Sequence, residues 1–169
     1  MTEPVTTGWT DFALATAGAA AALAGLVMVA ISVNIRQILG LAGVSARAAA
    51  AIGSLVLVVV SSALILVPGQ PGSALGAELL AAAAAAALLH GVSLSQSMRQ
   101  ATRPRAARLL SLPIAAAQLA PLIVGALLLV FGGDGSLAGA ALYWVAAGLI
   151  LTVIGSMLDA WVLMVEILR

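Results

Sequence analysis

Five long apolar stretches, separated by short polar segments, dominate the sequence. They run over about residues 12–34, 48–67, 73–96, 109–131 and 137–160. An α-helix of about 20 residues is long enough to cross the hydrocarbon of a bilayer. The chain is 63% hydrophobic and only 8% charged, whereas soluble domains carry about 25% charged residues. The sequence therefore predicts an all-α polytopic membrane protein, with residues 1–169 forming a single domain of five transmembrane helices.

A loop at residues 98–108 predicts how these helices are oriented. Short loops rich in basic residues stay on the cytoplasmic side of a membrane. Five spans with this loop inside place the N-terminus outside and the C-terminus inside. Every basic residue of the chain is an Arg, and Ala is abundant, which resembles the codon bias of a GC-rich bacterial genome. We therefore expect a bacterial cytoplasmic membrane, with anionic lipid headgroups or a partner contacting Arg99, Arg103, Arg105 and Arg108.

Small and polar residues recur every seven positions on four of the five predicted spans. Positions seven apart lie nearly on one line of a helix, and small residues let neighbouring helices approach closely in a membrane. We therefore expect these lines to face the interior of the bundle. They consist of Asp11, Gly18, Gly25 and Ser32; Arg47, Ser54 and Ser61; Ser111, Gln118, Gly125 and Gly132; and Thr152, Asp159 and Glu166.

The third span differs, because residues 81–87 are seven consecutive Ala. Alanine is small on every side and only weakly apolar, so neighbouring backbones can approach such a helix closely. The run predicts that this helix lies at the centre of the bundle.

Three charged residues, in the spans or just beyond them, have both a structural and a functional interpretation. Arg36 and Asp159 are expected at the same depth, so they are candidates for an ion pair that fixes helix register, with a gate as the alternative. Glu78 lies within the third span, where a carboxylate is costly and is a candidate functional group. It is also close enough to the PGQPG turn to be reached by water.

Uncharged polar residues at depth are candidates to line a conduit. Gln118 is the deepest strongly polar group, and either an interhelical hydrogen bond or a polar constriction would explain it. His90, the only histidine, is expected to form a hydrogen bond near the inner end, with pH sensing as the alternative. The candidate conduit residues are Ser54, Ser61, Glu78, Gln118 and Thr152.

The composition argues against several classes of function. The chain has no Cys and one His, so we expect no metal site and no haem. It has no Lys, so a Schiff base with retinal or pyridoxal phosphate is excluded, and no motif of an enzyme active site is present. The net charge of +1 argues against nucleic acid as a partner. We therefore expect neither a cofactor nor catalysis.

The first part of the chain resembles a group of small multi-pass membrane proteins of actinobacteria. The likeness covers about residues 9–70, and its most specific segments are SVNIRQIL and LVPGQ. Some members of that group are loosely named modulators of a membrane-anchored AAA protease. The resemblance implies a non-catalytic partner protein and assigns no role to any residue.

Two functions are compatible with these features. The polar lines favour an oligomeric channel or passive transporter for a small ion or solute, because conduction needs weak, repeated polar contacts. The alternative is a non-catalytic scaffold or regulatory partner of another membrane protein, such as a membrane protease. In both cases we expect a homo-oligomer in contact with membrane lipids, and in the second also a larger membrane protein.

Overall fold

The computed structural model describes residues 5–40, 44–99, 105–132, 135 and 137–168, and leaves out the side chains at positions 39, 97–99, 105–114 and 166–168. Within these residues the chain forms six helices: α1 Thr10–Val33, α2 Ile35–Gly40, α3 Val44–Ile65, α4 Gly72–Arg99, α5 Arg105–Gly132 and α6 Ala138–Leu168. All except α2 contain a segment long and apolar enough to cross a membrane. The predictions of an all-α chain and of five such helices are therefore confirmed.

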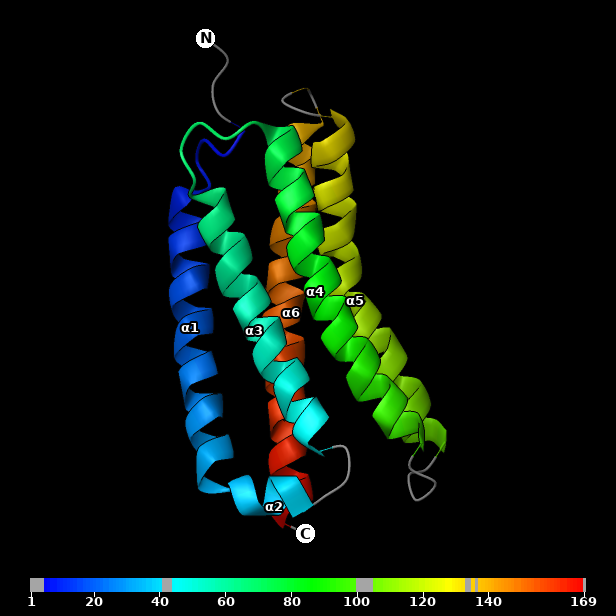
Figure 1. The fold of residues 1–169 in the computed structure, drawn as a ribbon. Helices are drawn as coiled ribbons and strands as arrows, with labels where there is room; N and C mark the ends of the chain where they lie inside the picture. The colour runs from blue at the N-terminus through cyan, green and yellow to red at the C-terminus, as the bar shows by residue number, and fades with distance from the viewer. Residues whose placement is uncertain (1–4, 41–43, 100–104, 133–134, 136, 169) are drawn as a thin grey trace.

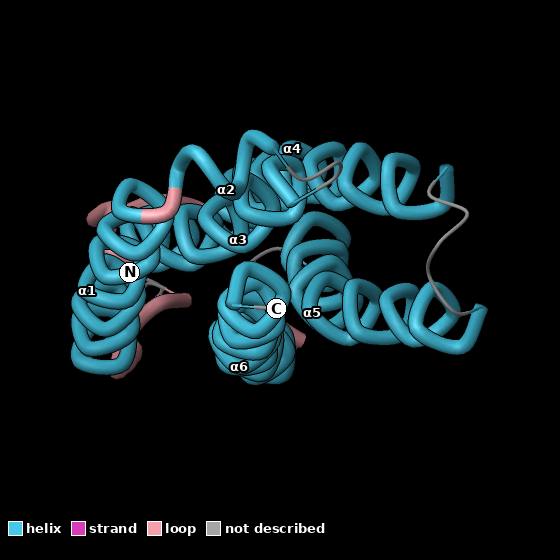
Figure 2. The backbone as a smooth tube through the Cα atoms, turned by 90° about the horizontal axis from the view of Figure 1, so that it is seen from below, coloured by secondary structure: helices cyan, strands magenta, loops and turns pink. Residues whose placement is uncertain are grey.

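The five long helices run roughly parallel or antiparallel to one another (Figure 1). Seen along the bundle, α6 lies against α3 and α5, whereas α1 lies at the edge and packs against α3 (Figure 2). The short helix α2 lies at one end of the bundle, called here the α2 end. The opposite end carries the connection between α3 and α4 and is called the turn end. Towards the α2 end, α4 and α5 lean together away from α3 and α6 in both views.

Helix α2 lies between the first two predicted spans, where the sequence predicted no helix. The chain leaves α1 at Asn34, whose side-chain amide donates a hydrogen bond to the Ala30 carbonyl over 2.9 Å. The Asn34 carbonyl then accepts hydrogen bonds from the backbone of Gln37 and of Ile38 and so starts the next turn. Ile38 is buried against Val44 and neighbouring apolar side chains, while Arg36 is exposed. Burial of one apolar side chain therefore folds the segment across the end of the bundle.

The most buried span is α3 and not the polyalanine helix. In the apolar window of α3, 56% of the residues are buried, against 33% for α4. Of the seven Ala, Ala83 and Ala86 are buried, whereas Ala84 and Ala85 are exposed. The prediction that α4 lies at the centre is wrong because α4 packs through one face, against α3 and α5, while α3 contacts α1, α4 and α6.

Close contact between α5 and α6 is made at glycines. A Cβ atom built on Gly125 would lie 2.6 Å from the Ala141 carbonyl oxygen, and one on Gly148 would lie 2.6 Å from the Leu122 nitrogen. These neighbours belong to the helix backbone, so they cannot rotate away. Small residues therefore hold α5 and α6 at a separation that no larger side chain would allow.

Among the residues whose side chains are described, the lines of small and polar residues face inward on three helices and not on the fourth. The side chains of Ser111 and Glu166 lie outside that set. Ser54 and Ser61 of α3, Gln118 of α5 and Thr152 of α6 are buried, as predicted. On α1, however, Gly18 and Gly25 are exposed, and no described atom of another helix lies within 4 Å of a Cβ at either position. The inward orientation predicted for α1 is wrong because this helix reaches the bundle only at its edge.

Candidate functional site

Four polar residues from four different helices lie inside the bundle near its middle. Ser54 and Thr152 lie near the midpoints of α3 and α6. The Ser54 hydroxyl oxygen is 2.8 Å from Nε2 of His90 on α4. The Thr152 hydroxyl shares its one proton between two backbone carbonyls, that of Gln118 on α5 at 2.9 Å and that of Gly148 on its own helix at 2.7 Å. We call Ser54, His90, Gln118 and Thr152 the central polar layer.

Helix geometry explains why residues of the layer lie at one depth. Ser54 follows Arg47 by seven positions on α3, and Thr152 precedes Asp159 by seven on α6. Arg47 and Asp159 form an ion pair, and seven residues span about 10 Å of helix. Since α3 and α6 run antiparallel, Ser54 and Thr152 both lie about 10 Å from this pair, towards the turn end.

The Gln118 side chain is the unusual member of the central polar layer. It is 1% exposed, and neither its amide nitrogen nor its amide oxygen has a hydrogen-bond partner among the described residues. It packs over Gly155, where a Cβ atom would overlap the amide. An unsatisfied buried polar group costs about 1–3 kcal/mol. An amide left without partners at mid-depth is therefore available to a polar molecule that reaches it.

Two serines extend the buried polar line of α3 towards the turn end. Ser61 and Ser62 are both 0% exposed, and neither hydroxyl has a hydrogen-bond partner among the described residues. Ser61 lies seven positions beyond Ser54, about 10 Å along the same face of α3. Polar groups thus recur along the inner face of α3 from Arg47 to Ser61.

Asp159 pairs with Arg47 and not with Arg36 as predicted. The Arg47 Nη2 and Asp159 Oδ1 atoms are 3.5 Å apart, and the two side chains are 21% and 22% exposed. Arg36 lies on α2, exposed and beyond the break at Asn34. The correction follows from packing, because α6 lies directly against α3, whereas α1 contacts α6 only slightly.

This pairing predicts a specific coupling between two substitutions. Arg47→Gln and Asp159→Asn should each lower the free energy of unfolding, and the double variant should lose about 1 kcal/mol less than the sum of the two losses. The coupling is modest because both side chains are partly exposed. It is measured by denaturant titration of the purified protein in detergent. The control pair, Arg36→Gln with Asp159→Asn, should give additive losses, and coupling in that pair instead would restore the original assignment.

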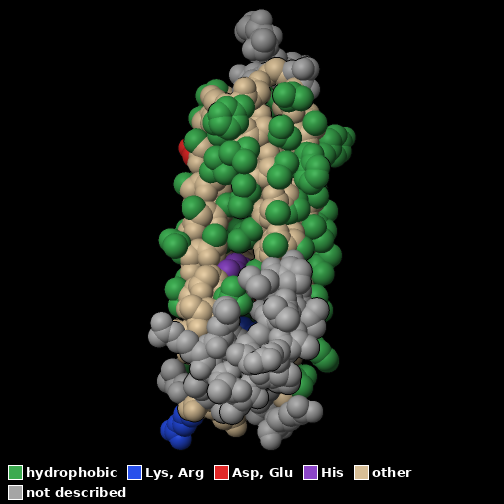
Figure 3. Space-filling view, turned by 90° about the vertical axis from the view of Figure 1, so that its right-hand side faces the viewer, with side chains coloured by type: hydrophobic (Ala, Val, Ile, Leu, Met, Phe, Trp, Pro, Cys, Tyr) green, Lys and Arg blue, Asp and Glu red, His purple; other side chains and the backbone are tan. Residues whose placement is uncertain are grey.

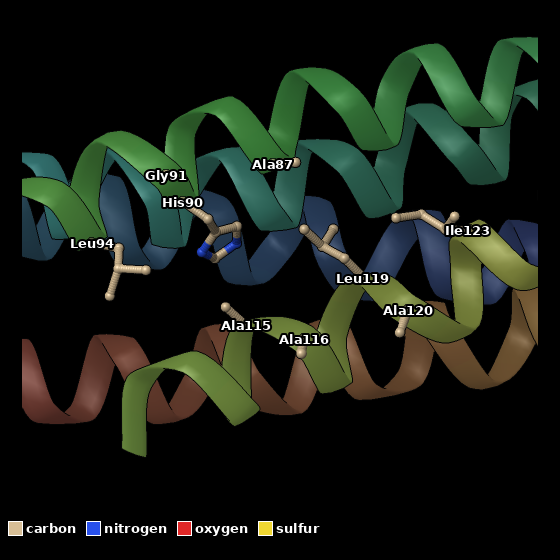
Figure 4. A pocket seen from close by; sticks show the side chains of 9 residues that line it. All are labelled: Ala87, His90, Gly91, Leu94, Ala115, Ala116, Leu119, Ala120 and Ile123. Carbon is tan, nitrogen blue, oxygen red and sulfur yellow. The ribbon is translucent and has the colours of Figure 1, made fainter. Parts of the chain in front are cut away.

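A groove lies between α4 and α5 beside the central polar layer. It has a volume of about 320 Å³ and is lined by Ala87, His90, Gly91 and Leu94 of α4 and by five apolar residues of α5 between Ala115 and Ile123. Figure 3 looks onto this side of the molecule, and the only histidine of the chain is visible there among apolar side chains. In Figure 4 the His90 ring projects from α4 towards α5, flanked by Leu94 and Leu119. His90 therefore contacts both the bundle interior, through Ser54, and the groove.

The remaining candidates do not join this site. Glu78 is exposed near the turn end of α4, where its carboxylate accepts a hydrogen bond from the Gln70 amide. Arg103, and the side chains of Arg99, Arg105 and Arg108, lie outside the described residues. Of the predicted conduit residues, the structure thus joins Gln118 and Thr152 directly, while Ser54 lies at the same depth and is joined to His90.

Sequence reasoning missed the parts played by His90 and Arg47. His90 was expected at the inner end, but it lies at the depth of Ser54, its hydrogen-bond partner on α3. Arg47 carried a usable signal, since it precedes Ser54 by seven residues, as Thr152 precedes Asp159. Matching these two spacings on antiparallel helices would have favoured Arg47 as the partner of Asp159.

The chain has no match among protein-family models, curated proteins or solved structures. The resemblance of residues 9–70 to actinobacterial membrane proteins therefore stays a prediction, and the function is argued from the site alone.

Proposed function

We propose that this protein is a passive transporter of the cytoplasmic membrane of a bacterium, which carries a small polar solute along the inner faces of α3, α5 and α6. The observation that carries this proposal is the buried Gln118 amide at the centre of the bundle, whose two hydrogen-bonding atoms have no partner among the described residues. Binding sites of transporters characteristically lie near the middle of the membrane. The proposal needs no catalytic residue and no cofactor.

The burial of the central polar layer favours a gated carrier over a permanently open pore. Ser54, Gln118 and Thr152 are 0–1% exposed. An open pore would expose such groups to water along its length. The lean of α4 and α5 away from α3 and α6 at the α2 end supports entry from that side. The solute would then reach Gln118 by a movement of α4 and α5 relative to α3 and α6.

The test is solute flux into vesicles that contain the purified protein. We expect urea or glycerol to enter faster than into protein-free vesicles, as followed by stopped-flow light scattering. Thr152→Val should slow this entry, because its hydroxyl lies in the central polar layer. Thr16→Val is the matched control, since Thr16 also donates to a carbonyl four residues earlier but lies on α1. Equal slowing by both substitutions, or no entry of either solute, would contradict the proposal.

The same proposal includes an orientation, with the turn end outside the cell and the α2 end inside. It is supported by the positive-inside rule applied to Arg36 and Arg47, which lie towards the α2 end. Val67→Cys and Gln37→Cys each introduce a cysteine at an exposed position, the first at the turn end and the second on α2. An impermeant thiol reagent should therefore reach these two cysteines from opposite sides of the membrane. In intact cells only the first should be labelled, and in permeabilised cells both. Labelling at Gln37→Cys in intact cells would reverse the orientation.

A second candidate function is that of a partner subunit, and the exposure of α1 favours it. Only 11% of the residues in the apolar window of α1 are buried, and Gly18 and Gly25 offer a small face that no other helix covers among the described residues. Such faces let helices of separate chains approach closely in a membrane. A homo-oligomer would be seen as a disulfide cross-link between two Gly25→Cys chains, and a complex with a larger membrane protein as co-purification of that protein. If the protein stays monomeric and uncross-linked in its own membrane, this candidate is excluded.

A further inference from the structure

The groove between α4 and α5 combines apolar walls with a single polar side chain. Its lining is Ala, Gly, Leu and Ile except for His90. Small side chains on both helices create this space, because they do not fill the gap between α4 and α5. They are those of Ala87, Gly91, Ala116 and Ala120. A volume of about 320 Å³ lies at the lower end of the range of about 300–1,000 Å³ found for small-molecule sites. The groove therefore fits a small, mainly apolar molecule.

The hydrogen bonds around His90 indicate which polar group such a molecule needs. The Ser54 hydroxyl has one proton, which it donates to the Ala50 carbonyl over 3.0 Å. We therefore assign the proton of the 2.8 Å contact to Nε2 of His90, which donates to the Ser54 oxygen. In the neutral ring Nδ1 is then a hydrogen-bond acceptor. His90 makes no other hydrogen bond within the described residues.

We propose that this groove binds a membrane-dissolved alcohol, whose hydroxyl group donates a hydrogen bond to Nδ1 of His90 while its apolar chain lies along the Ala and Leu side chains of α4 and α5. Among the described residues, the surface on the side of the groove is mainly apolar (Figure 3), so such a molecule would enter from the bilayer. A hydroxyl dissolved among lipid chains lacks water as a partner, which strengthens its hydrogen bond to the ring. Binding at this site does not depend on solute transport, because it uses the outer face of His90 and not the Gln118 amide.

The proposal is tested with a photoreactive decanol that carries a diazirine at the end of its chain. The full-length protein is reconstituted in phosphatidylcholine vesicles, illuminated with the probe and analysed by mass spectrometry of its peptides. We expect saturable labelling within residues 87–94 and 115–123, the segments that line the groove. Excess decanol should displace the probe, whereas decane, which has no hydroxyl, should not.

Two substitutions distinguish the contribution of the His90 hydrogen bond to decanol binding from that of the space in the groove. His90→Phe keeps a ring but removes the acceptor, and it should weaken decanol binding about fivefold to tenfold, the usual effect of losing one hydrogen bond. Ala116→Phe should fill the groove and abolish saturable labelling while leaving His90 and Ser54 in place. Its matched control is Ala147→Phe, an equally enlarging change at an exposed position of α6 outside the groove, which should leave labelling unchanged.

Several results would overturn the proposal. Labelling that does not saturate and spreads over all apolar surfaces would mean that only bulk lipid contacts the groove. If decane displaced the probe as effectively as decanol does, binding would not involve a hydrogen bond to His90. Equal effects of Ala116→Phe and Ala147→Phe would place the bound probe elsewhere. Solute flux has no part in these readouts, so a failure here and a failure of the transport proposal are distinguishable.

Discussion

Replacing Gly148 with alanine is expected to lower the free energy of unfolding by about 3 kcal/mol. The added Cβ would lie 2.6 Å from the Leu122 nitrogen and 2.8 Å from the Leu122 Cα atom. Both atoms belong to the α5 backbone, so the clash is relieved only if α5 and α6 move apart. Such a movement loses the many small dispersion contacts along the whole interface. The loss is measured by denaturant titration of the protein in detergent micelles.

The matched controls are glycines of α1. Gly18→Ala and Gly25→Ala make the same chemical change within a helix, but no described atom of another helix lies within 4 Å of the added carbon. Each is expected to change the free energy of unfolding by less than about 0.5 kcal/mol or to stabilise the helix slightly. If Gly148→Ala were as harmless as Gly25→Ala, α5 and α6 could not be as close as the structure places them.

Replacing Gln118 with leucine is expected to stabilise the protein and at the same time to abolish solute flux. Leucine has a similar size and no polar atoms, so it removes two unsatisfied groups that each cost about 1–3 kcal/mol when buried. The thermal midpoint in detergent should therefore rise. Flux of urea or glycerol should fall to the level of protein-free vesicles, because the solute loses the only amide in the central polar layer.

The control for this prediction is Gln37→Leu, the same substitution at an exposed position of α2. It should change neither the thermal midpoint nor the flux. A Gln118→Leu variant that is less stable than the parent would show that the amide has hydrogen bonds in the membrane, and the site would then be structural. A variant that is more stable but still transports would separate Gln118 from the solute path.

The helices themselves could be predicted from the sequence. The apolar stretches are at least about 20 residues long, and segments with Pro, Gly or Arg separate them. The five spans could therefore be predicted without knowing which helices pack together. Seven-residue spacing also predicted which faces of α3, α5 and α6 are buried, because position along a helix determines direction around its axis. On α1 the same spacing failed, since a line of small residues faces inward only if another helix covers it.

The assembly of the candidate site depended on tertiary structure. Hydropathy places each span at a depth but does not say which spans touch, so Asp159 was assigned to Arg36, although α3 and its Arg47 lie between α1 and α6. The packing of α4 against α3 places His90 beside Ser54, and small side chains on α4 and α5 leave room for the groove.

The sequence alone thus determined the number, length and buried faces of most of the helices, because these depend on local composition and helical period. Only the packing of one helix against another decided the ion pair, the central polar layer and the groove, because each joins residues more than 20 positions apart through contacts that no local pattern specifies.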